Sequence, residues 1–254
     1  MESVEIGVVE IGDHWRSDFG SRPGGFGKLG SMAAFTITVP AHPLALLGGF
    51  VVRWPRPLGE FETPAWVGAG LGLDCADVPF VAADDGVRKA VRALLREGGF
   101  KPSGRSKPAS EFLLGAAQRG ELGAINLAVD LCNVVSLHSG LPISVVDLEL
   151  VREPLQVEVM GAQTSYVFNP SGQIIRLDGL LCLCDSAGAC AGPVKDSQRS
   201  KTHAGTRASL QLVWGTRDAF ARTGMTLAWY RALHEKIDGL EIEPVDFVEA
   251  PTDA

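Results

Sequence analysis

The chain has 254 residues, of which 46% are hydrophobic and 21% are charged, and its formal net charge is −7. This composition fits one globular domain of large size, and the absence of any apolar run of 18 residues excludes a predicted membrane-spanning helix. The acidic balance argues against strong non-specific binding to RNA, although it is compatible with a local basic face, because salt screens charges beyond about 8–10 Å.

Cysteine content and the first residues bear on the cellular compartment. The five cysteines show no spacing typical of a disulfide framework. The opening Met-Glu-Ser-Val-Glu lacks the basic region and the apolar core of a signal peptide. We therefore expect a protein of the reducing cytoplasm.

The N-terminal part predicts strands joined by loops. Alternating apolar and acidic residues predict an edge strand at 4–11, and strands are also expected at 34–39, 46–54 and 66–74.

A glycine-rich loop is predicted between the first two of these strands, at residues 14–32. Its Gly25-x-Gly27-x-x-Gly30 spacing matches a dinucleotide fingerprint, but no strong strand precedes it and no helix follows. A flexible loop is therefore the favoured interpretation.

A helix is predicted over residues 86–97, capped by Asp84. Its outer face and the linker after it form the one clearly basic stretch of the chain, which comprises Arg88, Lys89, Arg92, Arg96, Lys101, Arg105 and Lys107. Two interpretations are open: a solvated helix face, or a surface that contacts RNA or phosphate.

Two further helices follow, at residues 108–119 and from Asn126 to His138. The second is apolar on most of its circumference and is expected to be buried, with Gly140 as its left-handed C-cap. Its polar residues are Asn126, Asp130, Asn133 and His138. Because an unpaired buried polar group costs about 1–3 kcal/mol, we expect these residues to bond to neighbouring loops or to line a pocket.

The C-terminal half predicts short strands, then a helix at 216–237 and a frayed acidic tail at 241–254. The strands are expected at 155–160, 164–168, 174–177, 180–184 and 209–214, with a turn at 169–172. Strands at both ends and helices in the middle favour an α+β fold, in which mixed β-sheets pack on a group of central helices.

Several cysteines and one loop are candidates for chemistry. Cys182, Cys184 and Cys190 with Asp185 could hold a metal, but they lack paired ligand spacing, so buried structural cysteines are favoured and no metal or cofactor is predicted. Cys132 is expected in the core rather than as a nucleophile. The loop that holds Lys195, Arg199, Lys201 and His203 is a candidate contact for an anionic ligand, against the alternative of a plain exposed loop.

The central helix carries a recognisable motif. It reads Asn126, Val129-Asp130, Asn133, Gly140-x-Pro142 and Asp147, and a second block runs from Lys195 to Gly215. These blocks resemble the B3/B4 domain of the phenylalanyl-tRNA synthetase beta subunit, over roughly residues 80–215. The resemblance implies a free-standing protein of one structural domain, divided into N-terminal strands and loops (1–80), a B3/B4-like core (81–215), a C-terminal helix (216–240) and the acidic tail (241–254).

The resemblance also implies a function. Such domains in bacterial synthetases hydrolyse tyrosine wrongly esterified to the phenylalanine tRNA, and their pocket includes the residue matched here by Asn133. Ser144 stands where the family has a histidine, and the apolar Val213 stands near the position of its tyrosine-reading glutamate, so tyrosine recognition does not carry over. The implied activity is binding of tRNA or aminoacyl-tRNA, with editing of mischarged aminoacyl-tRNA in trans; the alternative is a non-catalytic module for a free amino acid or small metabolite.

Residue roles follow as hypotheses from that resemblance. Asn133 would hold the amino acid or the terminal ribose, and Ser144 would place water or stabilise an oxyanion. Thr206 and Arg199 would meet the substrate carbonyl or the terminal phosphate. The remaining expected contacts with substrate or RNA are Lys201, His203, Arg88, Lys89, Arg92 and Arg105.

Overall fold

The computed structural model describes residues 35–75, 78–80 and 85–250. They belong to a compact unit that spans Ala34–Ala254. The predicted edge strand at 4–11 and the glycine-rich loop at 14–32 lie outside the described residues.

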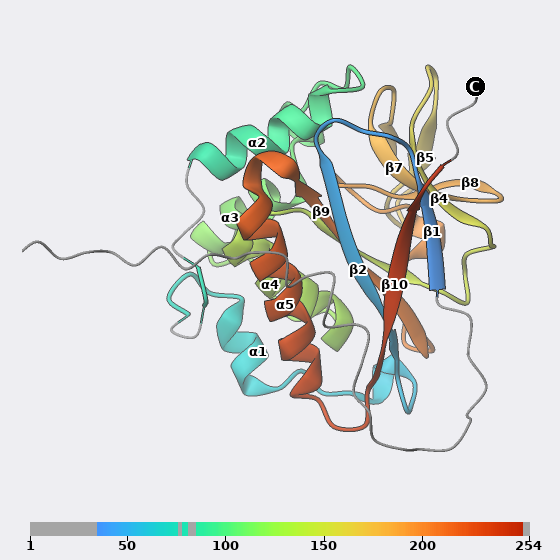
Figure 1. The fold of residues 1–254 in the computed structure, drawn as a ribbon. Coiled ribbons are helices and arrows are strands. Elements are labelled where there is room, and N and C mark those ends of the chain that lie inside the picture. Colours follow the sequence, from blue (N-terminus) through green and yellow to red (C-terminus); the bar gives the residue numbers. More distant parts are fainter. Residues whose placement is uncertain (1–34, 76–77, 81–84, 251–254) are drawn as a thin grey trace, which may run out of the picture. The chain divides into compact units, whose positions relative to one another are not determined.

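An eight-stranded mixed sheet forms the centre of this unit, in the order β3-β9-β2-β10-β1-β4-β7-β8 (Figure 1). Strand β1 runs parallel to its two neighbours, β10 and β4, and all other pairs are antiparallel. The bounds are β1 Phe35–Val39, β2 Ala45–Arg53, β3 Ile143–Asp147, β4 Leu155–Val159, β7 Leu181–Asp185, β8 Gly188–Ala191, β9 Ala208–Thr216 and β10 Glu241–Glu249. A separate hairpin joins β5 (Ser165–Val167) to β6 (Ile174–Arg176).

Within the described residues, five α-helices accompany the sheet. They are α1 Ala65–Gly70, α2 Asp85–Arg96, α3 Ala109–Gln118, α4 Leu127–Ser139 and α5 Phe220–Glu235, with short 3-10 turns η1 Leu58–Glu60, η2 Gly104–Ser106, η3 Gln198–Ser200 and η4 Arg217–Ala219. Helix α5 packs on β2, β9 and α4, while α4 also contacts α1, α3 and β3. This arrangement confirms the predicted α+β class, in which mixed sheets pack on central helices.

Helix α4 is the most buried of the five, as its apolar circumference predicts. Asn126 caps its start by accepting a hydrogen bond from the Val129 amide at 3.1 Å. Gly140 ends it in the left-handed conformation, at φ 76°, which confirms the predicted C-cap. The helix therefore begins and ends at positions that its own sequence fixes.

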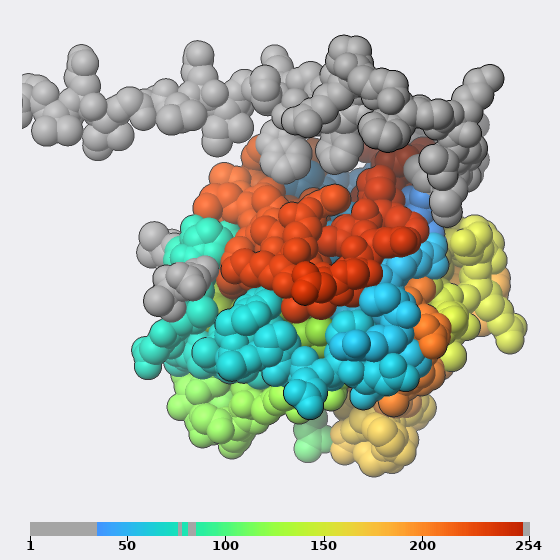
Figure 2. Space-filling model, turned by 90° about the horizontal axis from the view of Figure 1, so that it is seen from below, coloured from blue at the N-terminus to red at the C-terminus, as the bar shows by residue number. Residues whose placement is uncertain are grey.

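The prediction of a strand at 66–74 is wrong. Residues Ala65–Gly70 form helix α1, and a side chain in place of Gly70 would lie 3.0 Å from Val134 of α4. The glycines that loosened the expected strand instead allow this short helix to lie close against α4. Figure 2 shows the cyan surface of the α1 segment beside the orange-red surface of α5, where Lys236 lies 5.3 Å from the Trp66 ring.

The prediction of a frayed tail from Glu241 is also wrong. Glu241–Glu249 form β10, which lies inside the sheet between β2 and β1. Its Ile242, Val245 and Phe247 pack on the core, while Glu243 pairs with Arg53 at 3.0 Å. Asp246, which lies between Val245 and Phe247, is exposed on the opposite face of this half-buried strand.

Deletion of residues 241–254 should abolish cooperative folding, because β1 and β2 would lose the strand that joins them. Thermal unfolding followed by circular dichroism measures this effect. Deletion of residues 251–254 alone is the matched control and should leave the melting temperature within about 2 °C of the full chain. Equal melting temperatures for both truncations would contradict the assignment of β10 as an interior strand.

Candidate functional site

A cavity of about 610 Å³ opens between α3, α4, β3 and the chain segment after β8. Most of its wall is apolar and comprises Phe112, Leu113, Ala116, Ile125, Val129, Ile143, Val145, Phe168 and Val194. Its polar and charged lining comprises Arg119, Asn126, Asn133, Asn169, Lys195, Asp196, Lys201 and Thr202. A mainly apolar hollow of this size with a few convergent polar groups is typical of small-ligand sites.

The polar side chains of the α4 region separate into partnered and unpartnered groups. The Asp130 carboxylate accepts hydrogen bonds from the Ile125 amide and the Thr63 hydroxyl. His138 contacts the Gly70 carbonyl at 2.8 Å. Asn133 lines the cavity, and its amide has no hydrogen-bond partner among the described residues. It is therefore the group on α4 that is free to bond to a ligand.

Asp196 is the strongest titratable candidate in the cavity, and sequence reasoning assigned it no role. Burial raises the pKa of this carboxyl to about 6, although hydrogen bonds from the Ser144 hydroxyl and the Gly192 amide favour its ionised form. A carboxylate with a pKa near 6 is matched to general-base chemistry at neutral pH. The only sequence signal was its place in the Lys195–Gly215 block.

Ser144 does not line the cavity but forms a hydrogen bond with Asp196, which does. Its hydroxyl is fully buried in β3, donates to Asp196 Oδ1 at 2.7 Å and accepts a hydrogen bond from Trp214 Nε1 at 2.8 Å. The structure therefore places Asp196 and Asn133 in one cavity, and Ser144, which does not line it, is positioned to orient the Asp196 carboxylate.

Two lysines add positive charge to the same cavity. Lys201 Nζ donates to the Phe168 carbonyl at 2.6 Å, and Lys195 Nζ lies 3.9 Å from the centroid of the Phe168 ring. Burial lowers the pKa of both amines. Neither lysine forms an ion pair within 4.0 Å among the described residues, so both can meet an anionic group of a ligand.

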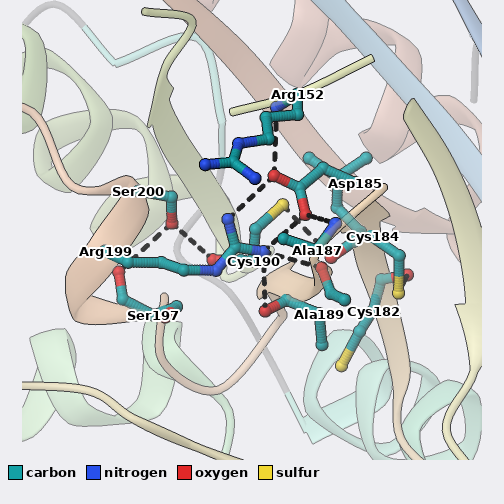
Figure 3. Close-up of polar contacts among 12 residues, drawn as sticks. Arg152, Cys182, Cys184, Asp185, Ala187, Ala189, Cys190, Ser197, Arg199 and Ser200 are labelled. Carbon is teal, nitrogen blue, oxygen red and sulfur yellow. Dashed lines mark hydrogen bonds and ion pairs between the residues drawn. The ribbon is translucent and has the colours of Figure 1, made fainter. Parts of the chain in front are cut away.

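Arg199 has its donors engaged elsewhere (Figure 3). Its guanidinium makes a bidentate pair with the buried Asp185, at 2.6 and 2.8 Å, and a 2.7 Å bond to the Gly188 carbonyl. The neighbouring Ser200 hydroxyl donates to the Cys190 carbonyl at 2.6 Å. These contacts attach η3 to the β7–β8 hairpin, and Arg199 does not line the cavity.

Thr206 and His203 surround a second buried carboxylate. The Thr206 hydroxyl donates to Asp147 Oδ2, and the His203 backbone amide donates to Thr206 Oγ1 at 2.8 Å. The His203 ring lies 3.4 Å from the same Asp147 oxygen. Neither residue lines the cavity, so the structure separates them from Asn133.

The predicted basic stretch divides into paired and unpaired cations. Arg88 pairs with Asp85 at 2.8 Å, and Arg92 makes a bidentate pair with Glu111 of α3 at 2.6 and 2.7 Å. Lys89 and Arg105 are exposed, with no ion pair among the described residues. Arg105 lines a groove that shares Lys195 and Phe168 with the cavity.

Four of the five cysteines are buried thiols, and the fifth, Cys75, is half-buried. Cys132, Cys182, Cys184 and Cys190 are all buried. Burial raises the pKa of each, to about 12 for Cys184. Within the residues that the structure describes, no three metal-ligating side chains gather. The β7–β8 sulfurs in Figure 3 therefore pack as small apolar groups.

Comparisons with known proteins concern the fold. No family model matches the chain, and no curated protein matches it. An N-terminal fragment of the phenylalanyl-tRNA synthetase beta-subunit from Pyrococcus horikoshii is similar over 87% of this chain, with a TM-score of 0.47 and 10% identity. The chain spans about half of that fragment, namely 54%.

A second solved structure, the TILS C-terminal domain, is similar over 30% of this chain and 71% of its own length. Its TM-score is 0.27 and its sequence identity is 18%. Among the described residues, no helix is long and apolar enough to span a membrane.

Replacement of Ser144 by alanine should raise the pKa of Asp196 above its value of about 6, because the hydroxyl stabilises the ionised carboxylate. Carbon-detected NMR titration of the aspartate carboxyls measures this change. Ser136→Ala, which removes a buried hydroxyl that bonds to the Leu141 carbonyl instead, should leave that pKa unchanged. An unchanged or lower midpoint in Ser144→Ala would contradict the assignment of Ser144 as the positioning residue.

Proposed function

We propose that the cavity binds an aminoacyl group carried on the end of a tRNA, and that the protein hydrolyses the ester that joins the two. The observation that carries this proposal is the presence, in one mainly apolar hollow, of the Asp196 carboxylate and of the Asn133 amide, which has no hydrogen-bond partner among the described residues. The motif that resembles the B3/B4 domain supports it, because it contains Asn133 and the block that contains Asp196.

The lining of the cavity suits the parts of an amino acid. The apolar wall formed by Phe112, Val129 and Val145 accommodates a side chain. The Asn133 amide can donate a hydrogen bond to the carbonyl oxygen of the aminoacyl group. The lysines at positions 195 and 201 complement the negative charge of RNA.

The proposed reaction is addition of water to the ester carbonyl. The Asp196 carboxylate accepts a proton from the attacking water, and the new bond forms between the water oxygen and the carbonyl carbon. The Asn133 amide donates a hydrogen bond to the resulting oxyanion. When the bond from carbon to the ribose oxygen breaks, protonated Asp196 returns its proton to that oxygen, and free amino acid leaves.

A non-catalytic module for a free amino acid is the second candidate. Lys195 and Lys201 favour it, because neither forms an ion pair within the part of the chain that the structure describes. The carboxylate of a free amino acid would neutralise their charge, whereas an ester carries no negative charge. The test is whether a free amino acid binds more tightly than its amide. Tighter binding of the free acid together with intact mischarged tRNA would select the module over the hydrolase.

Screening for deacylation across mischarged tRNAs should reveal hydrolysis of at least one. Asp196→Asn should slow the hydrolysis about 10²–10⁴-fold, as expected for loss of a general base. Asp246→Asn, the same change at an exposed carboxylate on β10, is the control and should keep the full rate. Loss of hydrolysis in both variants, or in neither, would contradict the role of Asp196 as general base.

The hydrolysis rate should depend on the ionisation of Asp196. Because the carboxylate form is the base and its pKa is about 6, the rate should be constant above pH 7 and fall tenfold per pH unit below about pH 5. Single-turnover rates with one mischarged tRNA between pH 4.5 and 8 measure this profile. A rate that is flat from pH 4.5 to 7 would contradict a role for Asp196 as base.

A further inference from the structure

A second hollow, of about 680 Å³, adjoins the cavity. Its wall includes Arg105, Ser106, Phe168, Ile174, Arg176 and Lys195. Phe168 and Lys195 line both hollows. A ligand that fills the cavity can therefore extend into this groove past the same two side chains.

Positive charge is concentrated where the two hollows meet. Lys201 and Arg105 both lie near Lys195, and each lowers the pKa of Lys195, although burial is the larger cause. Among the residues that the structure describes, Asp196 is the one carboxylate that lines either hollow. Three cations face one carboxylate here, in a chain whose net charge is −7. This local excess is suited to an anionic ligand group.

Apolar surface lies beside these cations. Ile174 of β6 is 64% exposed. Lys195 Nζ lies over the face of the Phe168 ring, 3.9 Å from its centroid. An exposed apolar side chain and an aromatic ring beside cations match the chemistry of a nucleotide, whose base stacks on apolar surface while its phosphate pairs with arginine.

We infer that this groove binds the phosphate of a nucleotide whose ribose reaches the cavity, with Arg105 as the principal phosphate contact. Arg105 is suited to this role because it is exposed and unpaired among the described residues, whereas Arg176 is paired with Asp178 at 3.0 Å. The inference rests on the proposed function, since it identifies how the carrier of the aminoacyl group is held.

Binding of adenosine 5′-monophosphate and of adenosine to the full chain tests this inference. We expect the monophosphate to bind about tenfold more tightly than adenosine at low salt, and Arg105→Ala to remove that difference without changing adenosine affinity. Arg105→Lys should restore part of it, and inorganic phosphate should compete with the monophosphate. Arg231→Ala, at a half-exposed arginine on α5 that pairs with Glu235 at 2.9 Å, should keep the full preference.

The outcomes separate this inference from the function on which it rests. Equal affinity for adenosine and its monophosphate, or an unchanged preference in Arg105→Ala, would overturn the phosphate subsite. If deacylation still depends on Asp196 in that case, the proposed function stands and only the subsite fails. Circular dichroism of the Arg105 variants should match the parent, because the side chain lies on the exposed turn η2.

Discussion

The hydrogen bond from the Ser144 hydroxyl to the Asp196 carboxylate is the interaction on which the cavity depends. It joins β3 to the segment that follows β8. Trp214 of β9 fixes the Ser144 hydroxyl from its other side. Because a carboxyl in an enclosed site is costly unless it is bonded, this pair stabilises the cavity wall at the point where Asp196 lines it.

Residues 193–206, which we term the closing segment, are attached at three points. Asp196 binds Ser144, Arg199 binds Asp185 in the arrangement of Figure 3, and Thr206 binds Asp147. Two of these partners, Asp147 and Asp185, are buried carboxylates at the ends of β3 and β7. The segment that carries Lys195 and Lys201 is therefore fixed before any ligand arrives, which lowers the cost of ordering it on binding.

The sequence predicted the features that depend on local signals. Helix α4 follows from its apolar run and its two caps, and an asparagine within a mainly apolar helix points to a pocket. The strand at 241–249 could not be predicted from local signals. Its glutamates are typical of a solvent-exposed tail, and only pairing with β1 and β2 makes the segment a strand. The role of Asp196 was hidden because its raised pKa comes from burial by segments distant in sequence. Arg199 reads as a free cation in the sequence, whereas the buried Asp185 that engages it is apparent only from the fold.

A crystal structure with an amide-linked aminoacyl-adenosine analogue tests the central claim most directly, because the amide resists hydrolysis. The account predicts the aminoacyl group in the cavity between α3 and α4, with its carbonyl oxygen within 3.2 Å of the Asn133 amide nitrogen. It also predicts that an Asp196 oxygen lies within reach of a water beside that carbonyl. An analogue bound elsewhere, with the cavity unfilled, would contradict the account.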